Sequence, residues 1–544
     1  MDVDKTSLYP LLLDILTDIS ESHIVAIDLE LSGIPSRKLR RDQRGNLQER
    51  YDELKKAADR FQVLQFGMTC VSQDVLNGKY ILKPYNFDIN PLVPERLGVD
   101  RVFAFQSGAI EFLLSQGFDI SRPFKRGVPY LSRIEAVAAR ERHLMREDKS
   151  AIQDVPLKPT EVDAIAFVEL TRKTIKEWMA ANDTTIARDL SIGSGGNAKQ
   201  DKGKSQKEKT QDAKELTRFE KRLVYQLVRS EFPELVAYNS RGRVKIARFD
   251  KTREDKLAAE RQTESDARIN KQKGLRWVVE ALLGSDLSKL NLRDCAFDPQ
   301  TGESIVADIS DYRARLNRAQ SKFRGRPRVL VGHNCFLDLV YMFRTFIGPL
   351  PDTVEDFQTR IHAMWPLIVD TKYMCTHNCS DINPISSLEQ TAKQLGQLEQ
   401  PVLEVPKKYS LYAKAPAFHE AGYDSYLTAT VAVRLAAKLE REGNYVTPSM
   451  PGLGKQDEAP ASSSPPAWKP SEAGIDWQHG GDPTISTDSV SEITPRDYRQ
   501  AYDEVIWNSS FEGGMPALSS DFWRVYGNKL RVFGTDESVL TLGD

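Results

Sequence analysis

Five residues that could bind metal ions or transfer protons lie in three short motifs that are far apart in the chain. The motifs are HIVAIDLELSGI, VGHNCFLDLVYMF and FHEAGYDSYL, and the five residues are Asp28, Glu30, Asp338, His419 and Asp424. Neighbouring carboxylates repel one another unless a cation lies between them, and Mg²⁺ prefers oxygen ligands and bridges carboxylates to phosphates. The set therefore predicts a two-metal site that cleaves phosphodiester bonds.

The first motif predicts a strand that carries two of the acids. Residues 24–27 are apolar and rich in β-branched side chains, so Asp28 and Glu30, at positions i and i+2, project from the same face. The alternative is an exposed strand end with two solvated acids. The other two motifs favour the metal site, because they supply further donors of the same kind.

The second and third motifs each predict a helix with an acid near its start. Residues 329–331 are typical of a buried strand, and the helix expected after Gly-His-Asn has Asp338 in its first turns. Residues 424–439 are helical in pattern, so Asp424 can bind metal from that helix while His419 precedes it. By itself, His419 would be a structural histidine; next to four acids it is a candidate base, since histidine accepts protons near neutral pH.

The three motifs together resemble the DEDD superfamily of 3′-to-5′ exonucleases, in its histidine-bearing subclass. Longer stretches resemble the poly(A)-specific ribonuclease (PARN) family of deadenylases and its small-RNA-trimming relatives. They are AIDLELSGI, RYDELKKAADRFQVLQFGMT, SGAIEFLLSQGFDISRPFKRGVPYL, VGHNCFLDL, GPLP, PLIVDTKYM and FHEAGYDSYLT. The likeness covers most of residues 22–140 and 328–440, in the same order.

This resemblance implies a ribonuclease H-like α/β fold of the DEDD exonuclease type, with a mixed sheet flanked by helices. It also implies dependence on two Mg²⁺ ions (Mn²⁺ being possible), single-stranded RNA 3′ ends with poly(A) as substrate, release of nucleoside 5′-monophosphates, and a possible homodimer. Asp28, Glu30 and Asp424 would hold one metal ion, and Asp28 and Asp338 the other. His419 would take a proton from the attacking water.

Three functions fit these observations. The first is poly(A) deadenylation, and the second is 3′-end trimming of small non-coding RNAs with weak base preference. The third is a catalytically inactive RNA-binding adaptor, which the intact set of five residues disfavours. A 3′-end enzyme needs a pocket closed behind the last nucleotide, and we expect its walls in the segment SGAIEFLLSQGF and in the loop after Gly33.

Composition sets broader limits. The chain has 544 residues, a formal net charge of −2 and five cysteines without a repeated spacing, which suits a reducing compartment better than a disulfide framework. No apolar run approaches the roughly 20 residues needed to cross a bilayer. Residues 1–20 predict an amphipathic helix rather than a signal peptide. We therefore expect an intracellular protein of the nucleus, the cytoplasm or both.

The pattern along the chain predicts a nuclease domain interrupted by an insertion. The expected parts are 1–155 and 256–445 for the exonuclease domain, 156–255 for a small inserted α+β domain with a disordered linker at 185–213, 446–490 for a second disordered linker, and 491–544 for a short C-terminal segment. Residues 61–70 and 80–82 are expected to form strands beside the strand of Asp28.

The insertion resembles the single-strand nucleic-acid-binding domain, named for an Arg-x-x-x-His motif, that PARN enzymes carry. The motif is degenerate here, because FEKRLVYQL has Tyr225 and Gln226 where the histidine would stand. Basic residues offer another RNA contact: the run KFRGRPR contains Lys322, Arg324, Arg326 and Arg328, and clustered cations neutralise phosphates. Residues 256–273 are also basic but are typical of a solvated helix with i,i+4 ion pairs.

Two smaller features have structural interpretations. Cys375, His377 and Cys379 have ligand-like spacing, but no second pair accompanies them, so a zinc site is not expected. Asp370 ends an apolar strand and is interpreted as a local cap or as a residue that supports the metal ligands.

The C-terminal residues contain no signature of an RNA-recognition domain, so recognition of the mRNA cap is not expected. Trp507 and Trp523 are interpreted as packing residues. Because every proposed ligand precedes residue 448, the sequence predicts that residues 448–544 can be removed without loss of the chemistry.

Overall fold

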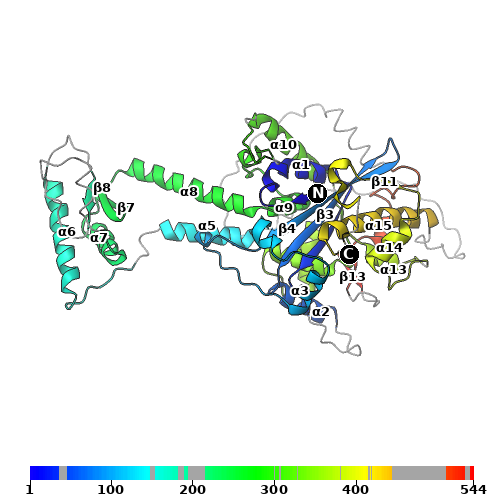
Figure 1. Cartoon of the computed structure of the whole chain (residues 1–544), viewed down its shortest axis with the longest axis horizontal. Coiled ribbons are helices and arrows are strands. Elements are labelled where there is room, and N and C mark those ends of the chain that lie inside the picture. The colour runs from blue at the N-terminus through cyan, green and yellow to red at the C-terminus, as the bar shows by residue number, and fades with distance from the viewer. Residues whose placement is uncertain are drawn as a thin grey trace, which may run out of the picture. The chain divides into compact units, whose positions relative to one another are not determined.

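A mixed β-sheet forms the centre of the first of two compact units into which the chain divides (Figure 1). The first unit contains residues 1–92, 102–130 and 274–544, and the second contains residues 93–101 and 131–273. The computed structural model describes residues 1–35, 46–147, 153–181, 189–193, 215–298, 301–305, 308–326, 329–379, 381–413, 417, 419–443, 510–532 and 539–543.

The sheet of the first unit has the strand order β1-β4-β3-β2-β9-β10, and β5 and β11 also pair with β4. The strands are β1 (Asp2–Val3), β2 (Ile24–Leu31), β3 (Val63–Asp74), β4 (Lys79–Asn90), β5 (Val128–Pro129), β9 (Val329–Gly332), β10 (Leu367–Asp370) and β11 (Val402–Glu404). β2 runs antiparallel to β3 and parallel to β9, and β9 runs parallel to β10. With helices packed on it, this is the expected ribonuclease H-like fold.

The pairing of β2 changes along its length, and this change makes room for a site. The first residues of the strand pair with β9 as far as Ala26 opposite Val331. The antiparallel pairing with β3 continues further, with Asp28 opposite Gly67. β9 ends at Gly332, so the two acids of β2 extend past the end of the neighbouring strand, where side chains from other elements can approach them.

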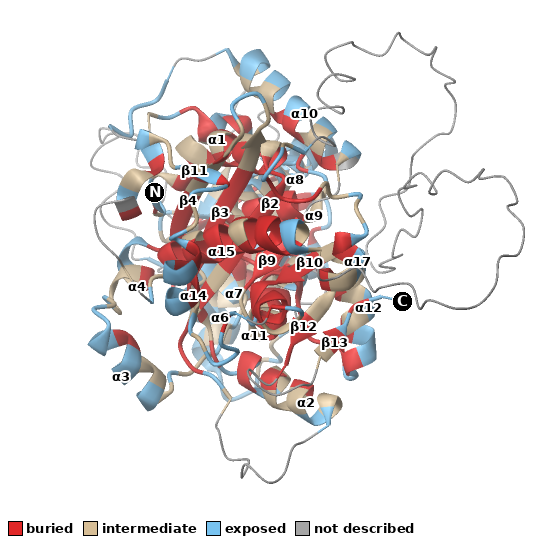
Figure 2. Cartoon of the chain, turned by 90° about the vertical axis from the view of Figure 1, so that its right-hand side faces the viewer, coloured by how far each residue is buried: buried red, intermediate tan, exposed pale blue. Residues whose placement is uncertain are grey.

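Helices surround the sheet and bury its apolar side chains (Figure 2). They are α1 (Leu8–Glu21), α2 (Leu47–Ala58), α3 (Ser107–Ser115), α4 (Arg122–Arg126), α9 (Arg276–Leu283), α10 (Ile309–Gly325), α11 (Phe336–Met342), α12 (Val354–Met364), α13 (Thr371–Thr376), α14 (Leu388–Leu395), α15 (Ala421–Glu442) and α17 (Phe522–Tyr526), with the short helical turns η4 (Leu292–Cys295), η5 (Phe343–Ile347) and η6 (Lys407–Ala413). α15 packs directly on β2, β3 and β4 and is buried along most of its length. None of the described helices is long and apolar enough to cross a membrane.

The described residues of the second unit form a three-stranded antiparallel sheet and four longer helices. Its elements are η1 (Glu95–Leu97), α5 (Arg133–Glu147), α6 (Val162–Ala180), β6 (Leu190–Ile192), α7 (Arg218–Glu231), β7 (Leu235–Ser240), β8 (Arg243–Arg248) and α8 (Lys251–Lys273). It is larger than the insertion expected at 156–255, because α5 and α8 pack on each other and belong to it. The solvated helix expected at 256–273 lies within α8.

Part of the expected linker at 185–213 is ordered, which corrects that prediction. Residues 190–192 form β6, which pairs with β8, and Ile192 is buried in the apolar core of the second unit. The alternation of Leu190 and Ile192 around a serine is the signal that the surrounding polar residues obscured. Residues 185–188 and 194–213 of that linker, and the expected linker at 446–490, lie outside the described residues.

The C-terminal segment, described at residues 510–532 and 539–543, packs into the core of the first unit. Phe522 is fully buried and Trp523 is 7% exposed, and both belong to the same apolar cluster as residues of β9, β10 and α15. The packing role expected for Trp523 is confirmed, and Trp507 lies outside the described residues. Leu540 is buried against the other face of the sheet. This packing argues against the expectation that residues 448–544 are dispensable.

Candidate active site

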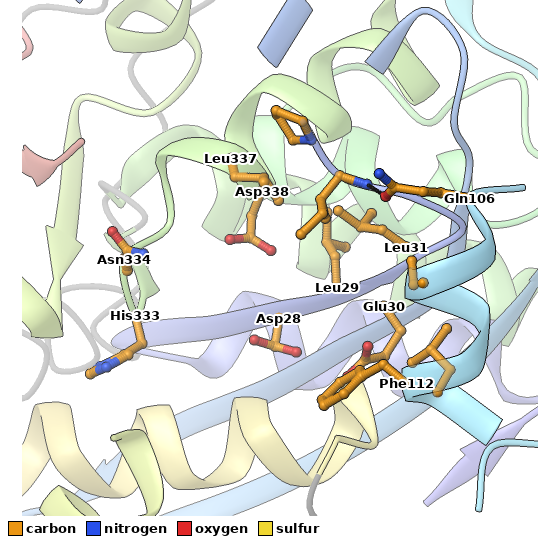
Figure 3. Close-up of a pocket in the computed structure, with 15 residues that line it drawn as sticks. Asp28, Leu29, Glu30, Leu31, Gln106, Phe112, His333, Asn334, Leu337 and Asp338 are labelled. Carbon is orange, nitrogen blue, oxygen red and sulfur yellow. Dashed lines mark hydrogen bonds between the residues drawn. The ribbon is translucent and has the colours of Figure 1, made fainter. Parts of the chain in front are cut away.

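The four acids predicted from sequence converge at the end of β9. Asp28 and Glu30 project from β2, Asp338 lies in the first turn of α11 and Asp424 in the first turn of α15. Figure 3 shows the carboxylates of Asp28, Glu30 and Asp338 facing one space. The structure therefore brings together residues that are almost 400 positions apart in the chain.

The electrostatics of this cluster are unfavourable without a cation. Burial raises the pKa of Asp28 well above its usual value, and the negative charges of Asp338, Asp424 and Glu30 raise it further. Burial and the charges of Asp424 and Asp338 act in the same way on Glu30. Burial raises the pKa of Asp338 to about 7, although backbone N–H groups oppose the shift, and burial also raises that of Asp424 to about 7. A divalent cation removes this penalty, so the donor set fits such an ion.

His419 lies beside the same carboxylates. Ligand atoms of Glu30, His419 and Asp424 all lie within 4.8 Å of one another, and this is the one group of potential metal ligands that converges in this way among the described residues. The backbone N–H of His419 donates to Asp424 Oδ2 at 3.2 Å. Its φ of +60° is a left-handed conformation that non-glycine residues rarely adopt, and such strain is concentrated at functional sites.

A glycine that was not predicted from sequence brings α15 to the acids of β2. Gly67 lies opposite Asp28 in the sheet. A Cβ atom at position 67 would lie 1.7 Å from the carbonyl oxygen of Ala421, the first residue of α15. No other residue type leaves space for this contact. Gly67 therefore determines how closely Asp424, three residues into the helix, approaches Asp28.

The pocket in front of the carboxylates has the two walls expected from sequence. It has a volume of about 550 Å³, and Ile34 and Pro35, from the loop after Gly33, and Phe112, from α3, line it. The side-chain oxygen of Gln106 accepts a hydrogen bond from the Ile34 N–H at 2.9 Å, which joins the two walls. Pockets of this size hold small ligands such as a single nucleotide.

Phe112 also connects the pocket to the candidate base. Its ring meets the His419 ring edge-on, with 4.7 Å between the ring centroids. Sequence analysis placed a wall in this segment but did not single out Phe112. The only sequence signal for Phe112 was an aromatic side chain within the segment that forms α3.

The loop after β9 forms the opposite side of the pocket. His333 and Asn334 line it, and Figure 3 shows them across from Phe112. Burial and the positive charge of Lys372 lower the pKa of His333 to about 3, so its ring is neutral at physiological pH. His333 Nδ1 lies 2.9 Å from Thr371 Oγ1. The break Gly-His-Asn in the sequence marked this loop, although neither side chain was predicted to have a role.

Asp370 is a cap, as expected. It is fully buried, and its Oδ1 atom accepts hydrogen bonds from the N–H groups of Lys372 at 2.9 Å and Asn334 at 2.7 Å. These two hydrogen bonds occupy the carboxylate oxygen through which Asp370 could bind a metal ion. Asp370 therefore supports the elements of the site rather than joining the four acids.

The other candidate residues do not form a second site in the described part of the chain. Cys375 and Cys379 are buried, and the His377 ring stacks on Tyr373 with centroids 4.1 Å apart. Lys322 forms an ion pair with Glu21, with 3.6 Å between its Nζ atom and Glu21 Oε1. The side chain of Arg324 and the whole of Arg328 lie outside the described residues, and Arg326 is half-buried directly after the last residue of α10.

The basic run precedes β9, whereas the carboxylates lie beyond the other end of that strand. Four residues of strand span roughly 13 Å, so Lys322 to Arg328 would contact RNA away from the reacting phosphate. An RNA-binding role for Lys322, Arg324, Arg326 and Arg328 stays a prediction.

The fold and the carboxylate cluster together define a ribonuclease H-like protein with a divalent-metal site. The model of the CAF1 family ribonucleases matches residues 3–432. The chain thus belongs to the CAF1 ribonuclease family.

Curated relatives match over most of the chain. Poly(A)-specific ribonuclease PARN of Danio rerio is 26% identical over 464 residues, which are 82% of this chain and 61% of that protein. An uncharacterized protein of Schizosaccharomyces pombe is 26% identical, covering 80% of this chain and 92% of its own length. The pre-piRNA 3′-exonuclease trimmer of Bombyx mori is 21% identical, covering 80% and 71%. The chain spans about three fifths of the length of the PARN proteins that it matches.

We predict that Gly67→Ala separates α15 from β3 and lowers both metal affinity and stability. The added methyl group cannot fit 1.7 Å from the Ala421 oxygen, and such overpacking costs roughly 1–3 kcal/mol. Gly325→Ala is the control, because nothing lies within 4 Å of its added Cβ. Manganese binding by calorimetry and urea unfolding measure the two effects. Equal metal affinity in Gly67→Ala and wild type would contradict this role.

We also predict that the metal-free protein loses stability as the pH rises from about 4 to about 7. Asp338 and Asp424 keep their protons to about pH 7 when folded, whereas an unfolded Asp ionises near pH 3.9, so the native state binds more protons across this window. Urea midpoints in a chelator at pH 5 and pH 7.5 test the sign. Asp338→Asn should lose less stability than the wild type over this range. A wild-type midpoint that does not fall between pH 5 and pH 7.5 would contradict the prediction.

Proposed function

We propose that the protein is a divalent-metal-dependent 3′-to-5′ exoribonuclease that removes nucleotides from RNA 3′ ends, with poly(A) as its preferred substrate. The observation that carries the proposal is that Asp28, Glu30 and Asp338 line a nucleotide-sized pocket, with His419 and Asp424 converging on Glu30 beside it. Membership of the CAF1 ribonuclease family and similarity to PARN proteins support it.

In the proposed reaction the chain's own residues bind ions, hold the substrate and move one proton. Asp28, Glu30 and Asp424 would hold one ion, and Asp28 with Asp338 a second. Bound Mg²⁺, or Mn²⁺ in its place, supplies positive charge for the phosphate and for the oxygen atoms that attack and leave. His419 takes a proton from the attacking water. The bond from water oxygen to phosphorus forms and the bond from phosphorus to the 3′ oxygen breaks. The 3′ oxygen keeps the bonding electron pair and takes a proton from solvent, and a nucleoside 5′-monophosphate leaves.

The pocket walls would select a chain end. Ile34 and Phe112 offer apolar and aromatic surface to the face of the last base, since bases stack on such side chains with little dependence on sequence. The start of this wall is hydrogen-bonded to the core, because the Tyr341 hydroxyl donates to the Gly33 carbonyl at 2.9 Å. An internal nucleotide has a further nucleotide attached to its 3′ oxygen and would meet this wall.

A second candidate is the 3′-end trimming of small non-coding RNAs. The similarity to a pre-piRNA 3′-exonuclease trimmer, of which the chain covers 71%, favours it. The pocket is lined mainly by apolar side chains opposite the acids, which is compatible with weak base preference. An inactive RNA-binding adaptor is disfavoured, because an adaptor gains nothing from four acids that repel one another.

The purified protein should shorten 5′-labelled RNA from the 3′ end in the presence of Mg²⁺. Faster removal of an A-tail than of a mixed-sequence tail would support deadenylation, and equal rates would support trimming. Asp28→Ala and Asp424→Ala should be folded and inactive, because each removes a metal ligand and also relieves charge repulsion. A 5′ cap should not change the rate. Mg²⁺-dependent activity in either variant would exclude the proposed site.

His419→Ala should lower turnover on the order of 10²- to 10⁴-fold, which is typical for loss of a general base. Because His419 is proposed to act on water, Mn²⁺ affinity in calorimetry should stay close to that of the wild type. Asp28→Ala is the comparison, since it should lose affinity. An equal loss in both variants would place His419 among the ligands of the group that it forms with Glu30 and Asp424.

A further inference from the structure

The C-terminal segment, described at residues 510–532 and 539–543, completes the edge of the sheet next to the active site. Gly527 forms an antiparallel bridge with Val369 of β10. Asn528 continues this contact: its N–H donates to the Ile368 carbonyl at 2.7 Å, and its side-chain oxygen accepts from the Ile368 N–H at 2.9 Å. The strands β12 (Lys529–Arg531) and β13 (Val539–Thr541) follow. β10, the last strand in the sheet order, is thus hydrogen-bonded on both sides.

A single carboxylate links this segment to the active-site loop. Asp370 Oδ2 accepts a hydrogen bond from the Arg531 N–H at 2.9 Å. Its Oδ1 atom accepts from the Asn334 N–H at 2.7 Å and from the Lys372 N–H at 2.9 Å. Asp370 is fully buried, so water cannot replace a lost partner without opening the structure.

The loop that Asp370 holds is not held by sheet pairing. β9 ends at Gly332, and Asn334 follows with a left-handed φ of +56°, which asparagine adopts more readily than most other residues. Thr371, next to Asp370, fixes the other part of the loop, since its hydroxyl donates to the Gly332 carbonyl at 3.1 Å and lies 2.9 Å from His333 Nδ1. The helix α11 starts directly after this loop, and it carries Asp338 four residues after Asn334.

We propose that the C-terminal segment is a positioning element of the active site and acts through Asp370. The Arg531 N–H orients the carboxylate, the carboxylate holds the Asn334 N–H, and the loop in turn sets the direction of α11 and of Asp338. The inference rests on the proposed function for its effect on RNA cleavage. The contact itself is a property of the fold and is testable without activity.

Two variants of one residue separate the backbone contact from the side chain. Arg531→Pro removes the N–H that binds Asp370, whereas Arg531→Ala keeps it and removes only the guanidinium, which donates to Thr376 Oγ1 at 3.0 Å. Asp370→Asn is the second test, because its amide places a donor where one of the N–H groups needs an acceptor. Asp521→Asn, in the same segment and largely exposed, is its control.

Hydrogen exchange at the Asn334 amide and single-turnover cleavage of A-tailed RNA are the two measurements. Arg531→Pro and Asp370→Asn should exchange faster at Asn334 and cleave roughly tenfold more slowly or worse at saturating RNA with little change in KM, since small misplacements of reacting groups have costs of this size. Asp521→Asn, a surface change, should stay within about twofold of wild type. Arg531→Ala should leave the exchange at Asn334 within about twofold of wild type, because it keeps the N–H that binds Asp370. Melting temperatures above the assay temperature exclude global unfolding as the cause.

Unchanged Asn334 exchange in Asp370→Asn would overturn the proposal, as would equally fast exchange at Asn334 in Arg531→Ala and Arg531→Pro. If Arg531→Pro does not fold, Asp370→Asn decides alone. If the wild-type protein cleaves no RNA, the proposed function fails, whereas the exchange at Asn334 still decides whether the C-terminal segment holds the loop.

Discussion

The close approach of α15 to the sheet is the contact on which the site depends. Only a residue without a side chain can stand opposite Asp28, because the first carbonyl of α15 occupies the place of a Cβ atom at Gly67. The helix then brings Asp424 to the acids of β2. The early end of β9 leaves room at the same place for Asp338. Backbone geometry thus creates the space and the acids fill it, although their mutual repulsion disfavours the arrangement.

That repulsion gives the site a balance between stability and function. Partly buried carboxylates with raised pKa values weaken the folded state near neutral pH when no cation is bound. Ligands that bind only the folded state restore stability by mass action. Hydrogen bonds around the site oppose this loss of stability. Asp370 accepts them from backbone N–H groups, and Gly33 and Ile34 are hydrogen-bonded to Tyr341 and Gln106.

Local patterns predicted what lies within one element, and failed where partners come from distant segments. Residues 24–31 could be recognised as a strand because apolar residues fill it up to its two acids. β4 was expected only at 80–82, because Pro84 and the buried polar residues Asn86 and Asp88 interrupt its apolar pattern. Their partners, Glu420 and Gln65, come from other elements. For the same reason the sequence indicated Asp424 but not Gly67. The need for a glycine at position 67 arises only from its contact with Ala421 of α15.

The contact between Arg531 and Asp370 also has a consequence for protein synthesis. A ribosome finishes every acid of the site and His419 before it reaches the strand that contains Arg531. Domains form largely from their N-terminal parts onward during translation. A nascent chain can therefore gather its ligands while the edge of β10 is still open, and only the later residues close it. Messages that stop early in this interval would yield proteins that contain the whole set of catalytic residues but lack the contact that holds their loop.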